Sequence, residues 1–238
     1  MGALSDIKVL DLTRVLAGPY ATMILADLGA EIIKIEQPGK GDDSRAYGPY
    51  KNGESAYFMS LNRNKESITL NMKTPEGKEI IKELVRKVDV LVENFRPGTM
   101  ERFGLGYEVL KELNPRLIYA ASTGYGQTGP YSQRPAYDAV VQAMGGIMSI
   151  TGQEDGVPTR VGTSIGDIAA GLFTAIGVLA ALHERERSGL GQMVDVAMLD
   201  CQVAILENAI SRYEFTGEIP KPIGNRHPSI VPFETFET

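Results

Sequence analysis

Cysteine and histidine, the residues that most often build metal and redox sites, are scarce in this sequence. Its 238 residues include one cysteine, Cys201, and two histidines, His183 and His227. A single cysteine excludes an intramolecular disulfide, and two histidines far apart in the sequence give no metal-ligand spacing. Cys201 lies in the apolar stretch "MLDCQVAIL", which favours a buried helix position over a nucleophile. We expect no metal site and a cytoplasmic location.

Excess positive charge and a long uninterrupted apolar run are also missing. The net charge is −6, which argues against nonspecific nucleic-acid binding but leaves room for a small polyanion where basic residues converge. The longest apolar run, around residues 165–182, is interrupted by Asp167, Gly171 and Gly177, so it predicts no membrane span. The start "MGALSDIKVL" has no signal-peptide pattern; we interpret it as the beginning of the fold, although it superficially fits a myristoylation pattern.

The first strand–turn–helix unit lacks the glycine pattern of dinucleotide-binding proteins. Its turn reads "TRVLAGP" instead of G-x-G-x-x-G, which disfavours NAD binding. Glu36 ends the next strand, and a strand-end carboxylate is favoured over a ribose ligand.

Strands and helices nevertheless alternate along the first 120 residues. Short apolar runs predict strands, and helical patterns lie between them. The helix over 74–87 has Thr74 as its N-cap and Pro75 in its first position. This alternation predicts an α/β fold with a parallel sheet. The expected strands are 7–13, 31–36, 67–73, 88–95, 116–123 and 192–198, and the expected helices are 20–30, 74–87, 104–115, 136–148, 164–187 and 199–217.

Two polar, glycine-rich loops cover residues 40–55 and 123–138, and the second follows a strand end directly. Ligands of open parallel sheets bind beyond the carboxyl ends of the strands, so such loops are candidates for function. Residues 1–217 are expected to form one large domain and residues 218–238, rich in proline and polar residues, a linker. We expect this chain to be part of a larger architecture.

Basic residues lie at or near several predicted strand ends. Each of them alone is typical of a solvated surface charge, but together above one sheet edge they would suit a ligand with phosphate groups. These residues are Arg14, Lys73, Arg96, Arg102 and Arg134.

Asp167 has two interpretations. Ser164 and Asp167 fit a capping box, with Ser164 as N-cap and Asp167 in contact with the positive end of the helix. At 100° per residue, Asp167 lies in line with Gly171, Thr174 and Val178, away from an apolar face formed by Ile165, Ile168, Leu172, Ile176 and Leu179. An open groove of small residues and an ionised carboxylate would also suit a nucleophile.

Several long motifs resemble the class III CoA-transferases, the family of formyl-CoA transferase, carnitine CoA-transferase and the bile-acid-inducible transferases. The similarity covers nearly all of residues 4–217. It is carried by "LDLTRVLAGPYATMILADLGAEIIKIEQPGKGDDSR", "NRNKESITLNMKTPEGK", "VENFRPGTMERFGLGYE", "YAASTGYGQTGPYSQRPAYDAVVQAMGG" and "GTSIGDIAAGLFTAIGVLAALHERERSGLGQMVDVAMLD".

The resemblance implies a Rossmann-like large domain, a smaller domain and an interlocked homodimer. It implies Asp167 in "GDIAAG" as the nucleophile that forms aspartyl anhydride and aspartyl-CoA thioester intermediates while CoA moves from an acyl-CoA to a carboxylic acid. CoA is then a substrate, and no cofactor is bound permanently. The implied CoA contacts are Val15, Leu16, Ala17, Leu70, Met72, Lys73, Asn94, Phe95, Arg96, Arg102, Arg134 and Tyr137.

The sequence departs from the family pattern at a few points. Gln37 stands where some members have an arginine, which weakens one expected contact with CoA. Tyr137 in "PAYD" stands where the related α-methylacyl-CoA racemases have a histidine, which disfavours a racemase. The small domain and the glycine-rich loop over the aspartate would follow Thr238. A racemase or isomerase and a non-catalytic CoA-binding fragment are the alternatives to a transferase.

Overall fold

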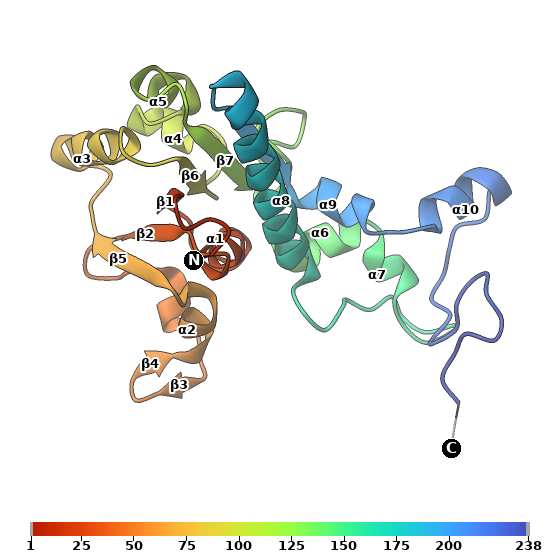
Figure 1. Cartoon of the computed structure of the whole chain (residues 1–238). Helices are drawn as coiled ribbons and strands as arrows, with labels where there is room; N and C mark the ends of the chain where they lie inside the picture. Colours follow the sequence, from red (N-terminus) through yellow and green to blue (C-terminus); the bar gives the residue numbers. More distant parts are fainter. Residues whose placement is uncertain (1, 237–238) are drawn as a thin grey trace.

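Six parallel strands form the central sheet of residues 2–236, which are the residues that this computed structural model describes (Figure 1). Their order is β5-β2-β1-β6-β7-β8, so the chain starts in the middle, builds outward to one edge, and then returns to build the other. The Rossmann-like α/β fold is confirmed. The strands are β1 (Lys8–Asp11), β2 (Glu31–Glu36), β5 (Lys65–Thr69), β6 (Val90–Glu93), β7 (Ile118–Thr123) and β8 (Met193–Ala197).

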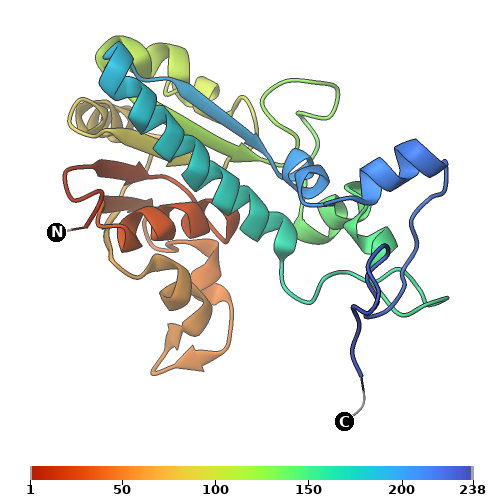
Figure 2. The same ribbon diagram turned by 45° about the vertical axis from the view of Figure 1, so that its right-hand side comes forward.

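Apolar side chains cover both faces of the inner strands, which explains why β6 and β7 are fully buried and mostly apolar, whereas the edge strand β5 is largely exposed. Along β1, Val9 packs with the helices of one face and Leu10 with those of the other. Figure 2 shows α1 (Ala17–Asp27) and α8 (Ile165–Ser188) side by side on the first face. The second face is covered by α3 (Pro75–Val85), α4 (Thr99–Phe103) and α5 (Tyr107–Leu113).

Capping residues and apolar patterns in the sequence predict the bounds of some of these elements closely. The Thr74 side chain accepts a hydrogen bond from the Gly77 N–H, and Pro75 opens α3, as the sequence predicts. Strand β2 has the predicted bounds. The predicted helix over 199–217 is instead two helices, α9 (Met198–Ala204) and α10 (Ala209–Thr216), because the chain turns between them and Glu207 has φ 54°.

The loop over residues 40–55 contains more structure than the sequence indicates. It holds the short 3₁₀ helix η1 (Asp43–Ala46) and the hairpin of β3 (Tyr50–Lys51) and β4 (Glu54–Ser55), and it leads into α2 (Ala56–Asn62). The Ser55 hydroxyl accepts from the Phe58 N–H and so caps α2. This segment hangs below β5 in Figure 1.

Helix α8 has 24 residues, the length predicted for the helix over 164–187, and contains a long window of strongly apolar residues. By length and composition alone it could cross a membrane, but half of that window is buried against the rest of the protein. Its buried residues include Ala170, Thr174 and Val178, which pack toward α1 and the sheet. The helix is thus part of the core of this fold.

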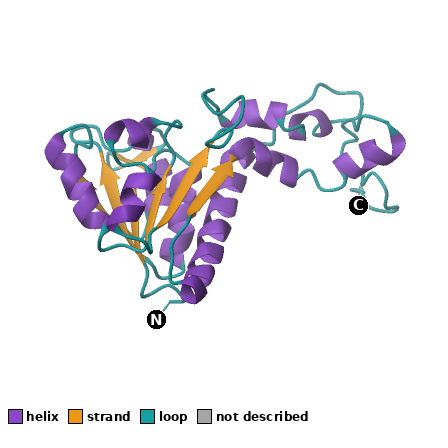
Figure 3. Cartoon of the chain, turned by 90° about the horizontal axis from the view of Figure 1, so that it is seen from above, coloured by secondary structure: helices purple, strands orange, loops and turns teal. Residues whose placement is uncertain are grey.

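Apart from α8 and β8, the helices after β7 lie beyond the edge of the sheet and extend away from it (Figure 3). They are α6 (Asp138–Met144), α7 (Ile147–Ile150), α9 and α10. Residues 218–236 form no helix or strand, and residues 237–238 of the predicted linker lie outside the described part of the chain. The division into a domain over 1–217 and a linker over 218–238 stays a prediction.

Candidate active site

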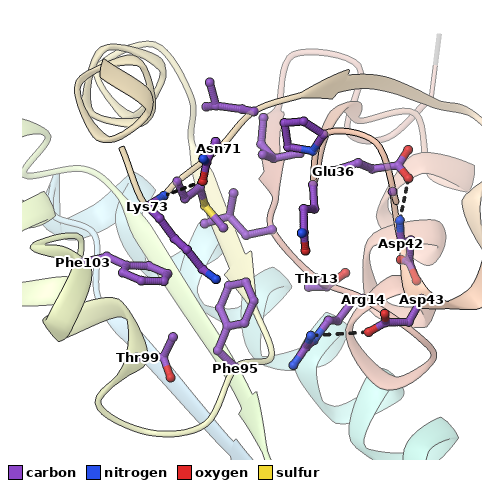
Figure 4. A pocket seen from close by; sticks show the side chains of 17 residues that line it. Thr13, Arg14, Glu36, Asp42, Asp43, Asn71, Lys73, Phe95, Thr99 and Phe103 are labelled. Atoms are coloured by element: carbon purple, nitrogen blue, oxygen red, sulfur yellow. Dashed lines mark hydrogen bonds and ion pairs between the residues drawn. The ribbon is translucent and has the colours of Figure 1, made fainter. Parts of the chain in front are cut away.

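A cavity of about 410 Å³ lies at the carboxyl ends of the strands, where the strand order reverses between β1 and β6 (Figure 4). Crevices at this point are the usual ligand sites of such sheets. The residues that line it follow the ends of β1, β2, β5 and β6: Leu12, Thr13, Arg14, Ile35, Glu36, Gln37, Pro38, Gly41, Asp42, Asp43, Leu70, Asn71, Met72, Lys73, Phe95, Thr99 and Phe103.

The turn after β1 has an unusual backbone. Val15 has φ 68°, a conformation that a β-branched residue rarely adopts. Its N–H donates to the buried Oδ1 of Asp42 at 3.1 Å, and Oδ2 of Asp42 lies 2.9 Å from the Lys34 ammonium. Burial opposes the charge on Asp42, but Lys34 and hydrogen bonds from Ser44 outweigh it, so the pKa of Asp42 is lowered. The charged carboxylate stabilises the turn in this shape.

A second buried ion pair lies beneath the same turn. The Lys65 ammonium is 3.1 Å from Oδ2 of Asp11 and also donates to the Thr22 hydroxyl. Burial disfavours the charge on Asp11, yet Lys65, Lys34 and the hydroxyls of Thr13 and Thr22 lower its pKa to about 2. Asp11 therefore stays ionised, and it joins β1 to α1 and to the edge strand β5.

The end of β6 is held by two neighbouring side chains. Asn94 donates from Nδ2 to the Arg14 carbonyl at 2.8 Å and accepts from the Arg14 N–H at 3.0 Å. Glu93 is buried, and its carboxyl accepts from the Phe95 N–H at 2.7 Å. Burial, with smaller effects from Glu101 and Asp195, raises the pKa of Glu93 to about 8. Glu93 is consequently a neutral acid at pH 7.

The charges around the cavity are partly paired. The Arg14 guanidinium lies 3.4 Å from the Asp43 carboxylate, which also pairs with Lys40. The guanidinium carbon of Arg14 is 5.7 Å from the centre of the Phe95 ring. Glu36 accepts two hydrogen bonds from Arg45, each 2.7 Å long, and one from the Ser67 hydroxyl. Burial is outweighed by these donors, and the pKa of Glu36 falls to about 2. Hydrogen-bond donors of the protein itself thus engage both oxygens of the Glu36 carboxylate, which agrees with a structural strand-end carboxylate rather than a ribose ligand.

The predicted CoA contacts fall into three groups. Leu70, Met72, Lys73 and Phe95 line the cavity itself. Val15, Leu16, Ala17 and Asn94 form or hold the turn beside it. Arg96 and Arg102 are exposed near the α4 side, while Arg134 and Tyr137 lie in the loop between β7 and α6, outside the cavity lining. In that loop Arg134 stacks 4.0 Å over the Tyr131 ring, and Tyr137 is 72% exposed.

Asp167 lies in the first turn of α8, as predicted, beside a second cavity. This cavity of about 350 Å³ is lined by Leu16, Tyr20, Tyr57, Ser60, Leu61, Gly162, Thr163, Ser164 and Ile168. Burial and the nearby Asp138 raise the pKa of Asp167 to about 7. Desolvation and a like charge therefore act against the helix dipole, which was expected to keep this carboxylate ionised.

The structure also corrects the predicted capping box and groove. Ser164 occupies the N-cap position, but its side chain makes no capping hydrogen bond. The small residues Gly171 and Thr174 do not line an open groove, because α1 covers them: a Cβ on Gly171 would lie 2.8 Å from the Ala17 carbonyl oxygen. The larger side chains of Leu172 and Ile176 point outward instead, with 43% and 58% of their surface exposed.

Sequence reasoning missed two neighbours of the nucleophile candidate. Tyr57 of α2 has its pKa raised to about 12 by burial and by Asp167. Asp138 opens α6 and accepts from the Gly166 N–H at 2.8 Å. Only the position of Asp138 next to Tyr137 could have drawn attention to it, since its contact with α8 spans the intervening loop.

The profile of CoA-transferase family III matches residues 4–238. The chain belongs to this family. It is 54% identical over 237 residues to the acetyl-CoA:oxalate CoA-transferase of Acetobacter aceti, covering 99% of this chain and 61% of that protein. It is 50% identical over 236 residues to the succinyl-CoA:glutarate CoA-transferase of Homo sapiens, covering 99% of this chain and 54% of that protein. The chain thus spans about three-fifths or less of the length of these relatives.

A solved structure of the family has the same fold. The crystal structure of a CAIB/BAIF family protein from Brucella suis superposes with a TM-score of 0.93 at 44% sequence identity, over 99% of this chain and 64% of that one. The resemblance seen in the sequence motifs is confirmed.

Proposed function

We propose that the protein moves CoA from an acyl-CoA donor to a carboxylic acid, with Asp167 as the nucleophile. The observation that carries this proposal is the position of the turn that follows β1. Arg14 lines the cavity at the switch point and Leu16, two residues later, lines the cavity beside Asp167. A single long ligand that crosses this turn can have its nucleotide end in one cavity and its thioester at the other.

The first cavity suits the nucleotide end of CoA. Arg14 and Lys73 supply positive charge for phosphate groups, and Phe95, Phe103 and Met72 supply apolar surface for a base. Arg96 and Arg102 are exposed cations within the same part of the fold. Arg134 and Tyr137 are available from the loop before α6 for contact with the rest of the ligand.

In the proposed reaction, an Asp167 oxygen attacks the thioester carbonyl carbon and the carbon–sulfur bond breaks, which gives an acyl-aspartyl anhydride and CoA thiolate. The thiolate attacks the aspartyl carbonyl, releases the donor acid and forms an aspartyl-CoA thioester. The acceptor carboxylate attacks the carbonyl carbon of the aspartyl-CoA thioester. The carbon–sulfur bond breaks, CoA thiolate leaves, and a second anhydride, between the acceptor and Asp167, is formed. The thiolate then attacks the acceptor carbonyl, which releases the new acyl-CoA and restores Asp167.

The second cavity beside Asp167 suits the small acyl groups of such a reaction. The two relatives described above are named for oxalate and for glutarate, both dicarboxylic acids. We propose a dicarboxylic acid as acceptor, the complete enzyme as a homodimer, and the cytoplasm as its location. A racemase or a non-catalytic CoA-binding fragment has no observation of its own in its favour.

The test is substitution of the nucleophile. We expect Asp167→Asn to lower the rate of CoA transfer by roughly a thousandfold or more, because an amide cannot form the anhydride. The wild-type protein, incubated with acyl-CoA and hydroxylamine, should acquire a hydroxamate at Asp167. Asp200→Asn, which changes an exposed aspartate in the first turn of α9, is the matched control. Full activity of Asp167→Asn would refute the proposal.

A further inference from the structure

The first turn of α8 is held by a carboxylate from another helix. Asp138, the first residue of α6, accepts from the Gly166 N–H through Oδ1 at 2.8 Å and from Nε2 of Gln142 through Oδ2 at 2.8 Å. The fit is close, since a Cβ on Gly166 would lie 3.0 Å from Oδ1 of Asp138 and 2.6 Å from a methyl group of Val141. We call Asp138 and Gln142 the α6 clamp.

The α6 clamp also fixes the loop that precedes α8. Gln142 is fully buried, and its Oε1 accepts from the Val161 N–H at 2.8 Å. The next three residues, 162–164, line the cavity beside Asp167. One pair of side chains therefore holds both the wall of this cavity and the helix turn that carries the nucleophile candidate.

Asp138 takes the part that Ser164 was expected to play. Ser164 makes no side-chain cap, so the carboxylate that compensates the free N–H groups of α8 comes from α6. A carboxylate in this position is also a negative charge beside Asp167, in surroundings where burial strengthens the repulsion between like charges.

We propose that Asp138 is a positioning residue for Asp167: its carboxylate fixes the first turn of α8 through the Gly166 N–H and brings a negative charge close to the nucleophile candidate. This inference rests on the proposed function for its catalytic meaning. This negative charge adds to the effect of burial in raising the pKa of the Asp167 carboxyl.

Other groups around Asp167 do not supply that charge. Tyr57 of α2, whose pKa is raised to about 12, is neutral at pH 7, and the other tyrosine that lines the cavity beside Asp167 is Tyr20 of α1. From α9, Gln202 presents a neutral amide, which donates to the Ile165 carbonyl at 3.4 Å.

Arg160 compensates Asp138 only in part. One guanidinium nitrogen lies 3.8 Å from Oδ2 of Asp138, while the same guanidinium donates to the carbonyls of Val161 and Gly162. Its side chain is about half exposed, at 49%, so water screens its charge. Asp138 therefore remains the charged group that acts on Asp167 most directly.

The test compares two variants that weaken the α6 clamp in different ways. Asp138→Asn removes the charge but keeps an oxygen for the Gly166 N–H, whereas Gln142→Ala opens the clamp and leaves the charge in place. The readout is the titration midpoint of the Asp167 carboxyl carbon in ¹³C NMR spectra, assigned with Asp167→Asn. Thermal unfolding verifies that each variant is folded.

We expect Asp138→Asn to move the midpoint to lower pH, toward the ordinary range of an aspartate, and Gln142→Ala to leave it near the wild-type value. The acid limb of kcat/KM should shift in the same direction in Asp138→Asn. An unchanged midpoint in Asp138→Asn, or equal shifts in both variants, would overturn the inference. Because the midpoint is measured without turnover, loss of the proposed transferase activity would be recognised separately.

Discussion

At the residue scale, the site is marked by carboxyl groups whose surroundings push their pKa values in opposite directions. Asp11 and Glu36 have matched donors and low pKa values, whereas desolvation raises the pKa of the buried Glu93 to about 8 and that of the half-buried Asp167 to about 7. Such separation is common where a protein prepares groups for chemistry. The sequence shows four acidic residues at strand or helix ends but not which of them are paired, because the partners come from distant segments.

Glu93 gives a prediction for the pH dependence of stability. Its pKa is raised in the folded state, so its contribution is fully present below the ordinary glutamate pKa of 4.5 and is lost as pH rises through about 8. We expect the Glu93→Gln variant, which keeps an acceptor for the Phe95 N–H, to lose this dependence. In urea unfolding, the difference between wild type and variant should change by up to about 1.4 kcal/mol per pH unit in that window. A constant difference from pH 5 to 8 would contradict a neutral Glu93.

At the element scale, α8 shows what periodicity can and cannot decide. The helix and the place of Asp167 in its first turn were predictable from the pattern. The face that packs inward was not, because hydrophobicity favours the large side chains of Leu172 and Ile176, whereas close approach of α1 requires the small ones. Gly171 lets the backbones of α1 and α8 approach each other closely. The sequence alone does not reveal which helix packs against Gly171.

The contact between α1 and α8 can be tested at Gly171. Glycine to alanine within an exposed helix stabilises a protein by roughly 0.5–1 kcal/mol. At Gly171 we expect the opposite sign, a loss of about 1–3 kcal/mol, since the new Cβ would lie 2.8 Å from the Ala17 carbonyl oxygen. The free energy of unfolding measures it, and Ile176→Ala on the exposed face should stay within about 1 kcal/mol of wild type. A Gly171→Ala variant more stable than wild type would contradict this prediction, because it would mean that α1 moves away from the added Cβ at little cost.

At the scale of the whole molecule, the sheet was the most predictable part. The sequence predicts a strand near each of the six observed ones, with β2 at its observed bounds and α3 almost at them, whereas the strand predicted over 67–73 begins and ends earlier, as β5 over Lys65–Thr69. The family motifs also predict Leu70, Met72, Lys73 and Phe95 as CoA contacts; the structure places all four in the lining of one cavity, and their contact with CoA stays a prediction. The two buried ion pairs beneath the turn after β1 could not be foreseen, because Lys34 is a polar residue within a predicted strand and Lys65 lies outside the predicted strands, and both are ordinarily exposed residues.

These ion pairs should matter to the stability of the whole fold. We expect Lys65→Met to lower the free energy of unfolding by about 3–5 kcal/mol, because it leaves Asp11 charged and unpaired in the core. Adding Asp11→Asn should restore a large part of this loss. Urea unfolding of the single and double variants at pH 7 measures both, and a double variant no more stable than Lys65→Met would contradict a charge imbalance.

The turn at Val15 keeps a particular backbone conformation at a cost in the stability of the folded protein. A β-branched residue at φ 68° raises the free energy of the folded chain, and the charged Asp42, itself buried, maintains that conformation. Selection for robustness alone would replace Val15 with glycine or asparagine, which adopt this conformation easily. The turn between Arg14, which lines one cavity, and Leu16, which lines the other, would then have a more flexible backbone. Variants of this protein that tolerate more heat are accordingly expected to leave this turn unchanged and to gain their stability elsewhere.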